Sequence, residues 1–324
     1  MRSKEEVMNL ILNYAKNDGR VRAVGMCGSR VNPKAPRDHF QDYDIVFIVS
    51  EMESFLSDPT WIDYFGERFL TQMPEQTTLF SPSLGGKFSY LMLFQGYTRI
   101  DLTLCPLSLK EDWNRGDEGI STILLDKDDL FRAPQLLSDK QYHLQMPTEA
   151  NFLDCCNEFW WVCTYVVKGL CRNEFLYAVD HLTIQARTEL LRMMSWRIGT
   201  ERGFTFSLGK NNKYLPNYLE KHEFLELQST YDVSTNKKVW HALQANQVMF
   251  IRESTKVAKS QLMTLRPRKS LKAVTNFVYS YLRYLRYLRY LLFVNQLFWS
   301  CIFSPYYKVT CPFTRSCFLI NAST

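Results

Sequence analysis

The amino-acid sequence predicts an α+β protein in which a strand-containing domain precedes a helical one. Three observations support this. Short apolar runs bounded by turn residues dominate before about residue 145, long helical patterns follow from about residue 149, and 324 residues are enough for two packed domains. With 46% hydrophobic and 22% charged residues, the composition is typical of a globular protein rather than a disordered one.

The first domain is expected to span residues 1–145. Apolar residues at helical spacing predict a helix that ends at the turn 17–19. Apolar runs then predict strands at 21–27 and 44–50 and a hairpin of strands 88–94 and 98–104 around a Gln-Gly-Tyr turn. Strands interleaved with helical stretches are typical of an α/β or α+β domain.

The second domain is expected to span residues 146–264, with its boundary at the segment around Pro147. Strand signals fade there, and long helical patterns cover residues 149–170 and 178–196. We therefore predict an α-helical domain.

Charge is distributed unevenly along the chain. Residues 265–324 carry nine Lys or Arg and no acid, so residues 1–264 hold 30 bases against all 33 acids, a net charge of −3. An acidic body argues against nucleic acid as the main partner and is compatible with a polycationic substrate.

The cysteines and the N-terminus indicate a cytoplasmic protein. None of the nine cysteines shows metal-ligand spacing, and free buried thiols suit a reducing compartment. The first 15 residues form a charged amphipathic pattern without the apolar core of a secretion signal.

One set of polar residues lies at the start of an apolar strand. Gly28 and Ser29 follow the first predicted strand, and Asp42 and Asp44 come after twelve further residues. Strand residues two apart point to the same side, so both carboxylates project together. They repel each other unless a cation lies between them, and carboxylate and phosphate oxygens are what Mg²⁺ prefers.

A third acid, Asp101, lies inside the apolar run 98–104. An Asp there is costly to bury unless it is paired or coordinates a metal. One alternative is that the neighbouring Arg99 satisfies it; the other is that it completes a two-metal set with the Asp-x-Asp pair. Gly28 and Ser29 could then face phosphate oxygens, with Gly allowing close approach.

This order of motifs resembles the nucleotidyltransferase superfamily, and within it the aminoglycoside 6-adenylyltransferases, which inactivate streptomycin. The similar segments are GSRVNP (28–33), FQDYDIVFIV (40–49), RIDLTL (99–104), WWV-x-x-YVVKGL (160–170) and GK-x-x-KYL (209–215). The resemblance covers about residues 1–260. It implies a Pol β-like domain with a mixed sheet, followed by a helical domain, and an enzyme that confers antibiotic resistance.

The resemblance also implies roles for particular residues. Asp42 and Asp44 would bind Mg²⁺, Asp101 would bind one ion and help to activate the attacking hydroxyl, and Gly28 with Ser29 would hold the triphosphate. AMP would pass from ATP to the 6-hydroxyl of streptomycin, with pyrophosphate leaving. A monomer acting on a small molecule is expected.

Other residues carry weaker predictions. Lys210 and Lys213 would contact the triphosphate as point charges, and Arg30 would contact phosphate or pair structurally near the aspartates. Low-ranking candidates for binding the aminoglycoside are the acids Glu149, Glu158, Glu174 and Asp180 and the tryptophans Trp160 and Trp161. The alternatives are that the acids are merely solvated and that the tryptophans pack in the core.

Residues 265–324 depart from the family pattern, since they are acid-free, aromatic and repetitive, with RYL recurring at 283, 286 and 289. A non-native extension caused by a reading-frame change is one interpretation, and attachment to anionic lipid is another. Competing functions are transfer to a protein or other acceptor, and a non-enzymatic membrane- or nucleic-acid-binding protein that acts through this tail.

Overall fold

The computed structural model describes residues 2–113, 121–131 and 139–264. The chain divides into two compact units, one comprising residues up to His143 with Thr205–Ser207, the other beginning at Leu144 and containing the remainder. The predicted tail 265–324 lies outside the described residues. No described helix is long and apolar enough to cross a membrane.

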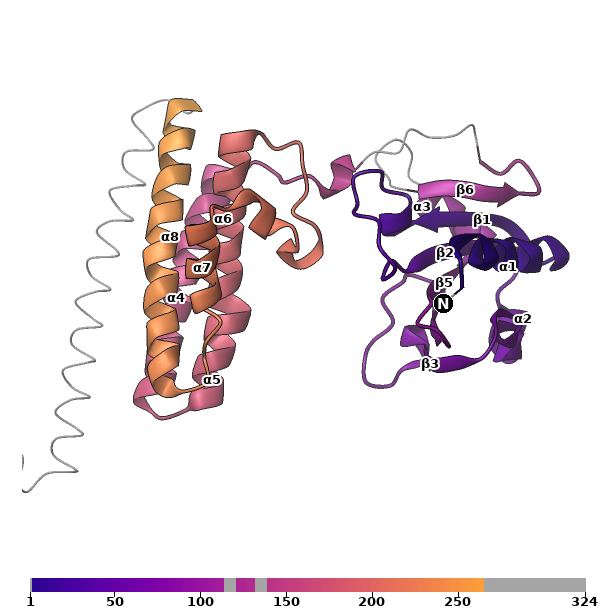
Figure 1. Cartoon of the computed structure of the whole chain (residues 1–324), viewed down its shortest axis with the longest axis horizontal. Helices are drawn as coiled ribbons and strands as arrows, with labels where there is room; N and C mark the ends of the chain where they lie inside the picture. Colours follow the sequence, from indigo (N-terminus) through magenta and orange to yellow (C-terminus); the bar gives the residue numbers. More distant parts are fainter. Residues whose placement is uncertain (1, 114–120, 132–138, 265–324) are drawn as a thin grey trace, which may run out of the picture. The chain divides into compact units, whose positions relative to one another are not determined.

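A six-stranded sheet forms the first unit (Figure 1). Its strands are β1 (Val21–Cys27), β2 (Tyr43–Val49), β3 (Arg68–Gln72), β4 (Phe88–Phe94), β5 (Arg99–Pro106) and β6 (Ser121–Asp126). The order is β3-β4-β5-β2-β1-β6, and β2 and β5 run parallel while the other neighbours are antiparallel. The predicted α+β class and mixed sheet are confirmed.

Both faces of the sheet are covered by apolar residues. The larger cluster includes Phe47 and the buried face of α1 (Lys4–Asn17), namely Val7, Ile11 and Ala15. Ser3 and Glu6 form a capping box at the N-terminus of this helix. Two short helices, α2 (Glu53–Ser57) and α3 (Lys110–Trp113), belong to the same unit.

The smaller cluster lies on the opposite face and contains Ala23, Val46, Ile48 and Cys105. Residues two apart on a strand share a face, so Asp44 projects from β2 on the same side as Val46 and Ile48. The sequence therefore places this acid at the end of a buried row of side chains.

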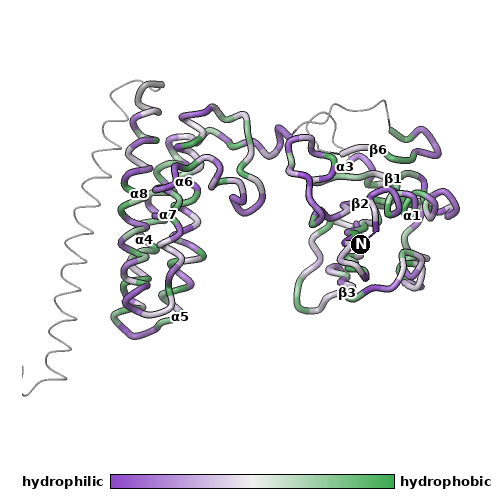
Figure 2. The backbone as a smooth tube through the Cα atoms, viewed as in Figure 1, coloured by the Kyte–Doolittle hydropathy of each residue, from purple (hydrophilic) through white to green (hydrophobic). Residues whose placement is uncertain are grey.

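Helices make up the second unit. They are α4 (Glu149–Cys171), α5 (Phe175–Asp180), a π-helical turn (His181–Ala186), α6 (Arg187–Arg202), α7 (Lys221–Ser229) and α8 (Asn236–Thr264). Hydrophobic and hydrophilic residues alternate along α4, α6 and α8 in Figure 2, as helices with one buried face require. Thr148 and Asn151 form a capping box that begins α4.

The core of this unit combines aromatic packing with buried ion pairs. Phe159 of α4 stacks on Phe250 of α8, with ring centroids 3.8 Å apart. Arg197 of α6 donates to a Glu253 carboxylate oxygen at 2.8 Å, and both side chains are buried. Since a buried charge must be paired, this contact fixes α6 against α8.

The six cysteines within the described residues are free, as predicted, and burial raises the thiol pKa values of Cys27 and Cys156 to about 12.

Candidate functional site

Three aspartates meet where β2 and β5 begin. In the parallel pairing of these strands Asp44 lies opposite Asp101, and Asp42 comes immediately before the first residue of β2. The predicted trio therefore gathers at one edge of the sheet. This depends on long-range register, because β3 and β4 lie between the two strands in the sequence although β2 and β5 are neighbours in the sheet.

Gly28 lies against the carboxylate of Asp44. Its φ is +75°, and a Cβ at this position would lie 2.0 Å from Asp44 Oδ2. Gly28 opens a short 3₁₀ turn (Gly28–Arg30) directly after β1, so the backbone of Ser29 follows immediately after it. Both the left-handed φ and the close approach require glycine here.

Arg30 supports the segment that carries Asp42. Its Nε donates to the carbonyl oxygen of Asp42 at 2.9 Å and its guanidinium to that of Gln41 at 2.6 Å. The guanidinium also lies over the ring of Tyr43, 3.6 Å from the centroid. These contacts are structural pairing, one of the two roles that the sequence left open for Arg30.

Arg99 pairs with Asp101, the alternative that the sequence also left open. Its Nε and a terminal nitrogen donate to the two carboxylate oxygens of Asp101 at 2.8 and 2.7 Å. The same Nε lies 3.8 Å from Asp42 Oδ2. One guanidinium therefore serves two of the three carboxylates.

Burial and neighbouring carboxylates raise the pKa values of Asp44 and Asp42. The pKa of Asp44 rises to about 6, first because the group is buried and then because of the charges on Asp101 and Asp42. The pKa of Asp42 is raised by burial and by Asp101, against the opposing effect of Arg99. Crowded carboxylates of this kind favour a cation between them.

The chemistry of this donor set fits Mg²⁺, which takes oxygen ligands and is commonly held by one or two carboxylates together with substrate phosphates. Within the described residues, however, no group of three or more His, Cys, Asp or Glu side chains is close enough to hold a metal ion by itself. In this arrangement Arg99 donates to both carboxylate oxygens of Asp101.

Lys210 and Lys213 belong to the helical unit, in a loop with unusual backbone angles. Gly209, Asn211 and Asn212 all have positive φ. Both lysines are exposed, and the Lys213 ammonium lies 5.0 Å from the ring centroid of Tyr214. An exposed ammonium on such a loop is suited to contacting a ligand.

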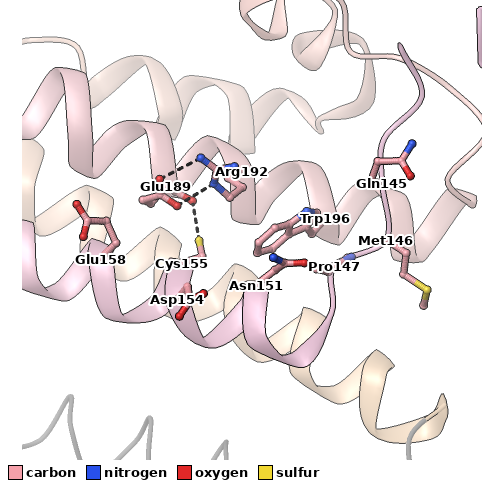
Figure 3. A pocket seen from close by; sticks show the side chains of 10 residues that line it. All are labelled: Gln145, Met146, Pro147, Asn151, Asp154, Cys155, Glu158, Glu189, Arg192 and Trp196. Atoms are coloured by element: carbon pink, nitrogen blue, oxygen red, sulfur yellow. Dashed lines mark hydrogen bonds and ion pairs between the residues drawn. The ribbon is translucent and has the colours of Figure 1, made fainter. Parts of the chain in front are cut away.

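The helical unit also contains an acidic pocket of about 460 Å³ between α4 and α6 (Figure 3). Its acids are Asp154 and Glu158 on α4 and Glu189 on α6. Arg192 pairs with Glu189, with an Nε–Oε2 distance of 2.8 Å. The exposed Asp154 and Glu158 leave the pocket with net negative charge.

Of the low-ranking candidates of the sequence, Glu158 lines this pocket, whereas Glu174, Asp180 and Trp160 do not. Glu174 and Asp180 are exposed at the two ends of α5. Trp160 is buried, at 9% exposure, and packs edge-on against Phe159 and Phe250, which favours its core-packing alternative.

Sequence reasoning overlooked Asp154, Glu189 and Trp196 of this pocket. The spacing of Asp154 and Glu158, four residues apart in a helical pattern, places both on one face and was a usable signal. Glu189 and Trp196 lie on another helix, and nothing local in the sequence joins them to α4.

Comparison with known proteins confirms the resemblance. A profile of the family described as streptomycin adenylyltransferase matches residues 1–281. The aminoglycoside 6-adenylyltransferase of Campylobacter jejuni is 48% identical over 258 residues, 80% of this chain and 89% of the relative. That of Bacillus subtilis (strain 168) is 45% identical over 259 residues, 80% of this chain and 91% of the relative.

Among solved structures, an aminoglycoside 6-adenyltransferase from Bacillus subtilis is 39% identical, with 86% of this chain and 98% of that chain covered and a TM-score of 0.38. On the family match and the curated relatives, this chain belongs to the streptomycin adenylyltransferase family and is a nucleotidyltransferase.

Proposed function

We propose that this protein transfers AMP from ATP to a hydroxyl group of an aminoglycoside, with the 6-hydroxyl of streptomycin as acceptor. The observation that carries the proposal is the register pairing of Asp44 with Asp101, beside a glycine that packs on the Asp44 carboxylate. The similarity to aminoglycoside 6-adenylyltransferases supports the choice of acceptor class.

Asp42, Asp44 and Asp101 would hold Mg²⁺ together with the phosphates of ATP. Bound there, the metal supplies charge neutralisation at the phosphoryl group and a lower pKa for the attacking hydroxyl. The turn at Gly28 and Ser29 offers backbone N–H groups and a hydroxyl to the triphosphate.

The reaction is an in-line displacement. The acceptor oxygen forms a bond to the α-phosphorus, and the bond to the β-phosphate oxygen breaks, so that pyrophosphate leaves. The hydroxyl proton passes to Asp101. The chain mainly positions the reactants, which can supply a large part of the rate enhancement.

The acidic pocket between α4 and α6 suits the cationic groups of an aminoglycoside. Asp154 and Glu158 are exposed carboxylates that can accept charge-assisted hydrogen bonds from guanidinium or ammonium groups. Trp196 of α6 adds an aromatic surface to the lining of the same pocket.

Lys210 and Lys213 would contact the triphosphate, and Lys210→Ala tests this. Because the proposed contact is to phosphate, the variant should raise the KM for ATP more than the KM for the aminoglycoside. Steady-state kinetics with each substrate varied in turn measure both constants. Equal increases would indicate a general folding defect instead.

The function is tested by pyrophosphate release from Mg-ATP with a panel of aminoglycosides, and by mass spectrometry of each acceptor. Streptomycin is expected to stimulate release and to gain one adenylyl group. Asp42→Asn and Asp44→Asn should each abolish turnover, because an amide cannot supply the anionic ligand. No mass gain in any aminoglycoside would reject this acceptor class and favour a protein or other small-molecule acceptor.

Modification of an antibiotic with ATP suits the cytoplasm, and the free thiols within the described residues agree with a reducing compartment.

A further inference from the structure

Arg99 occupies an unusual position for a residue beside a proposed metal site. It stands two residues before Asp101 on β5, so both side chains leave the strand on the same face. Its two hydrogen bonds, at 2.8 and 2.7 Å, cover both carboxylate oxygens of Asp101. Its Nε also lies within ion-pair distance of Asp42, at 3.8 Å.

The Arg99–Asp101 ion pair is exposed enough to solvent to rearrange. The Arg99 side chain is 44% exposed and that of Asp101 19%. An ion pair with so much solvent contact contributes little to stability. A stronger interaction of another group with Arg99 or Asp101 can therefore compensate for breaking this ion pair.

Among the described residues, Arg99 is the cation that forms ion pairs with the aspartates of this cluster. Arg99 contacts the carboxylates of Asp101 and Asp42, whereas the hydrogen bonds of Arg30 go to backbone carbonyl oxygens. The guanidinium is thus the main positive charge that offsets the carboxylate repulsion.

We propose that Arg99 acts as the counter-ion of the three aspartates in the free protein, and that its pairing with Asp101 and the binding of a divalent cation are mutually exclusive. This rests on the metal site of the proposed function. A cation that binds Asp101 must compete with the guanidinium for the same two carboxylate oxygens and must overcome its positive charge.

Two consequences follow for the nucleotide. The free protein should bind divalent metal weakly, because Arg99 opposes it. The triphosphate supplies further oxygen ligands for the metal and an alternative anion for the displaced guanidinium, which pairs well with phosphate. Arg99 is therefore a positioning residue that links metal binding to nucleotide binding.

The test measures Mn²⁺ binding to the free protein by electron paramagnetic resonance, without nucleotide and at fixed ionic strength. Arg99→Gln removes the charge and should tighten Mn²⁺ binding roughly 5- to 50-fold, the usual range for coupled sites. Arg99→Lys keeps the charge but loses the planar guanidinium that donates through two nitrogens. It should therefore give a smaller increase in Mn²⁺ affinity.

Arg22→Gln is the matched control. Arg22 pairs with Asp128 through two nitrogens in the same unit, and neither residue belongs to the aspartate cluster. This variant should leave Mn²⁺ affinity unchanged. Asp44→Asn sets the baseline for binding outside the site, and thermal unfolding verifies that each variant folds.

The outcomes separate the two hypotheses. If the wild type binds Mn²⁺ above the Asp44→Asn baseline but Arg99→Gln binds no more tightly, the counter-ion role is rejected while the metal site stands. If neither the wild type nor Arg99→Gln exceeds that baseline, the metal site itself is rejected, and the counter-ion role with it. Should Arg99→Gln not fold, a tighter Mn²⁺ affinity in Arg99→Lys is the required result.

Discussion

At the residue scale, Gly28 shows how closely the backbone packs against the carboxylate of Asp44. Gly28→Ala would force a Cβ to 2.0 Å from Asp44 Oδ2 at a φ of +75°. We expect a loss of turnover on the order of 100-fold, because small displacements of a positioned group have effects of that size. Pyrophosphate release measures it.

Gly85→Ala is a control that separates backbone strain from a steric clash with a neighbouring side chain. Gly85 also has a positive φ, +59°, but a Cβ there would meet nothing within 4 Å. This variant should lose about 1 kcal/mol of stability from the backbone angle alone and keep full turnover. Wild-type turnover in Gly28→Ala would show that the Asp44 carboxylate does not need its present position.

Asp44 also controls the pH dependence of stability in the metal-free protein. Its pKa is about 6 in the folded chain, against about 3.9 for an ordinary aspartate in the unfolded chain. Between these pH values the folded state binds more protons, so the stability contributed by this group is present below about pH 4 and is lost as pH rises through 6.

Asp44→Asn should therefore be more stable than the wild type at pH 7, by about 1 kcal/mol after allowance for solvent screening. The difference should vanish as pH falls toward 4. Urea unfolding in the presence of a chelator, at several pH values, measures it. A less stable variant at pH 7 would mean that Asp44 makes a stabilising contact rather than a repulsive one.

At the scale of elements, the buried ion pairs of the helical unit provide the next prediction. Glu253 of α8 accepts hydrogen bonds from Arg197 at 2.8 Å and Arg252 at 2.9 Å, and its side chain is fully buried. Glu253→Gln should destabilise the protein by about 3 kcal/mol, because it leaves the charge of a buried arginine poorly matched.

Glu201→Gln is the control for this pair. Glu201 contacts the same arginine at 2.8 Å, but its side chain is 47% exposed. Its loss should change the free energy of unfolding by less than about 1 kcal/mol. Similar losses in the two variants, measured by urea unfolding, would contradict a special role for burial.

The elements that the sequence predicted well have local signals. The hairpin of β4 and β5 was visible from apolar runs flanking a Gly-containing turn, and its strands agree with the structure to within two residues. Strands β3 and β6 were not predicted. They are the outer strands of the sheet, and β3 has mostly exposed side chains, so neither shows a clear apolar pattern.

The candidate site also contains some residues with local sequence signals and others without them. Asp42, Asp44 and Asp101 were found because acids beside apolar strands are conspicuous. The choice between Arg99 as partner and metal as partner could not be made, since it depends on side-chain geometry across β2 and β5. The acidic pocket combines α4 and α6, which only the tertiary fold brings together.

At the scale of the whole molecule, the prediction concerns residues 265–324, which lie outside the described residues. The family profile extends to residue 281, beyond the composition change near 265. We expect a variant ending at Thr264 to retain adenylyl transfer, because the proposed site residues all precede it. Activity and limited proteolysis of this variant beside the full chain measure the effect.

A second variant ending at residue 281 makes the comparison decisive. If activity is lost on truncation at 264 but kept at 281, residues 265–281 complete the helical unit. If both variants are inactive although folded, the tail takes part in function, as the non-enzymatic alternative would require.

The pairing of β2 with β5 determines where insertions and deletions can be tolerated. The loop between Arg30 and Asp42 lies outside the strands. A change in its length therefore leaves Asp44 and Asp101 on the same faces of their strands. One residue added within β5 after Asp101 would instead turn either the acid or the buried Leu102 and Leu104 to the opposite face. Natural length variation in active members of this family should therefore fall in the loop and avoid the two strands.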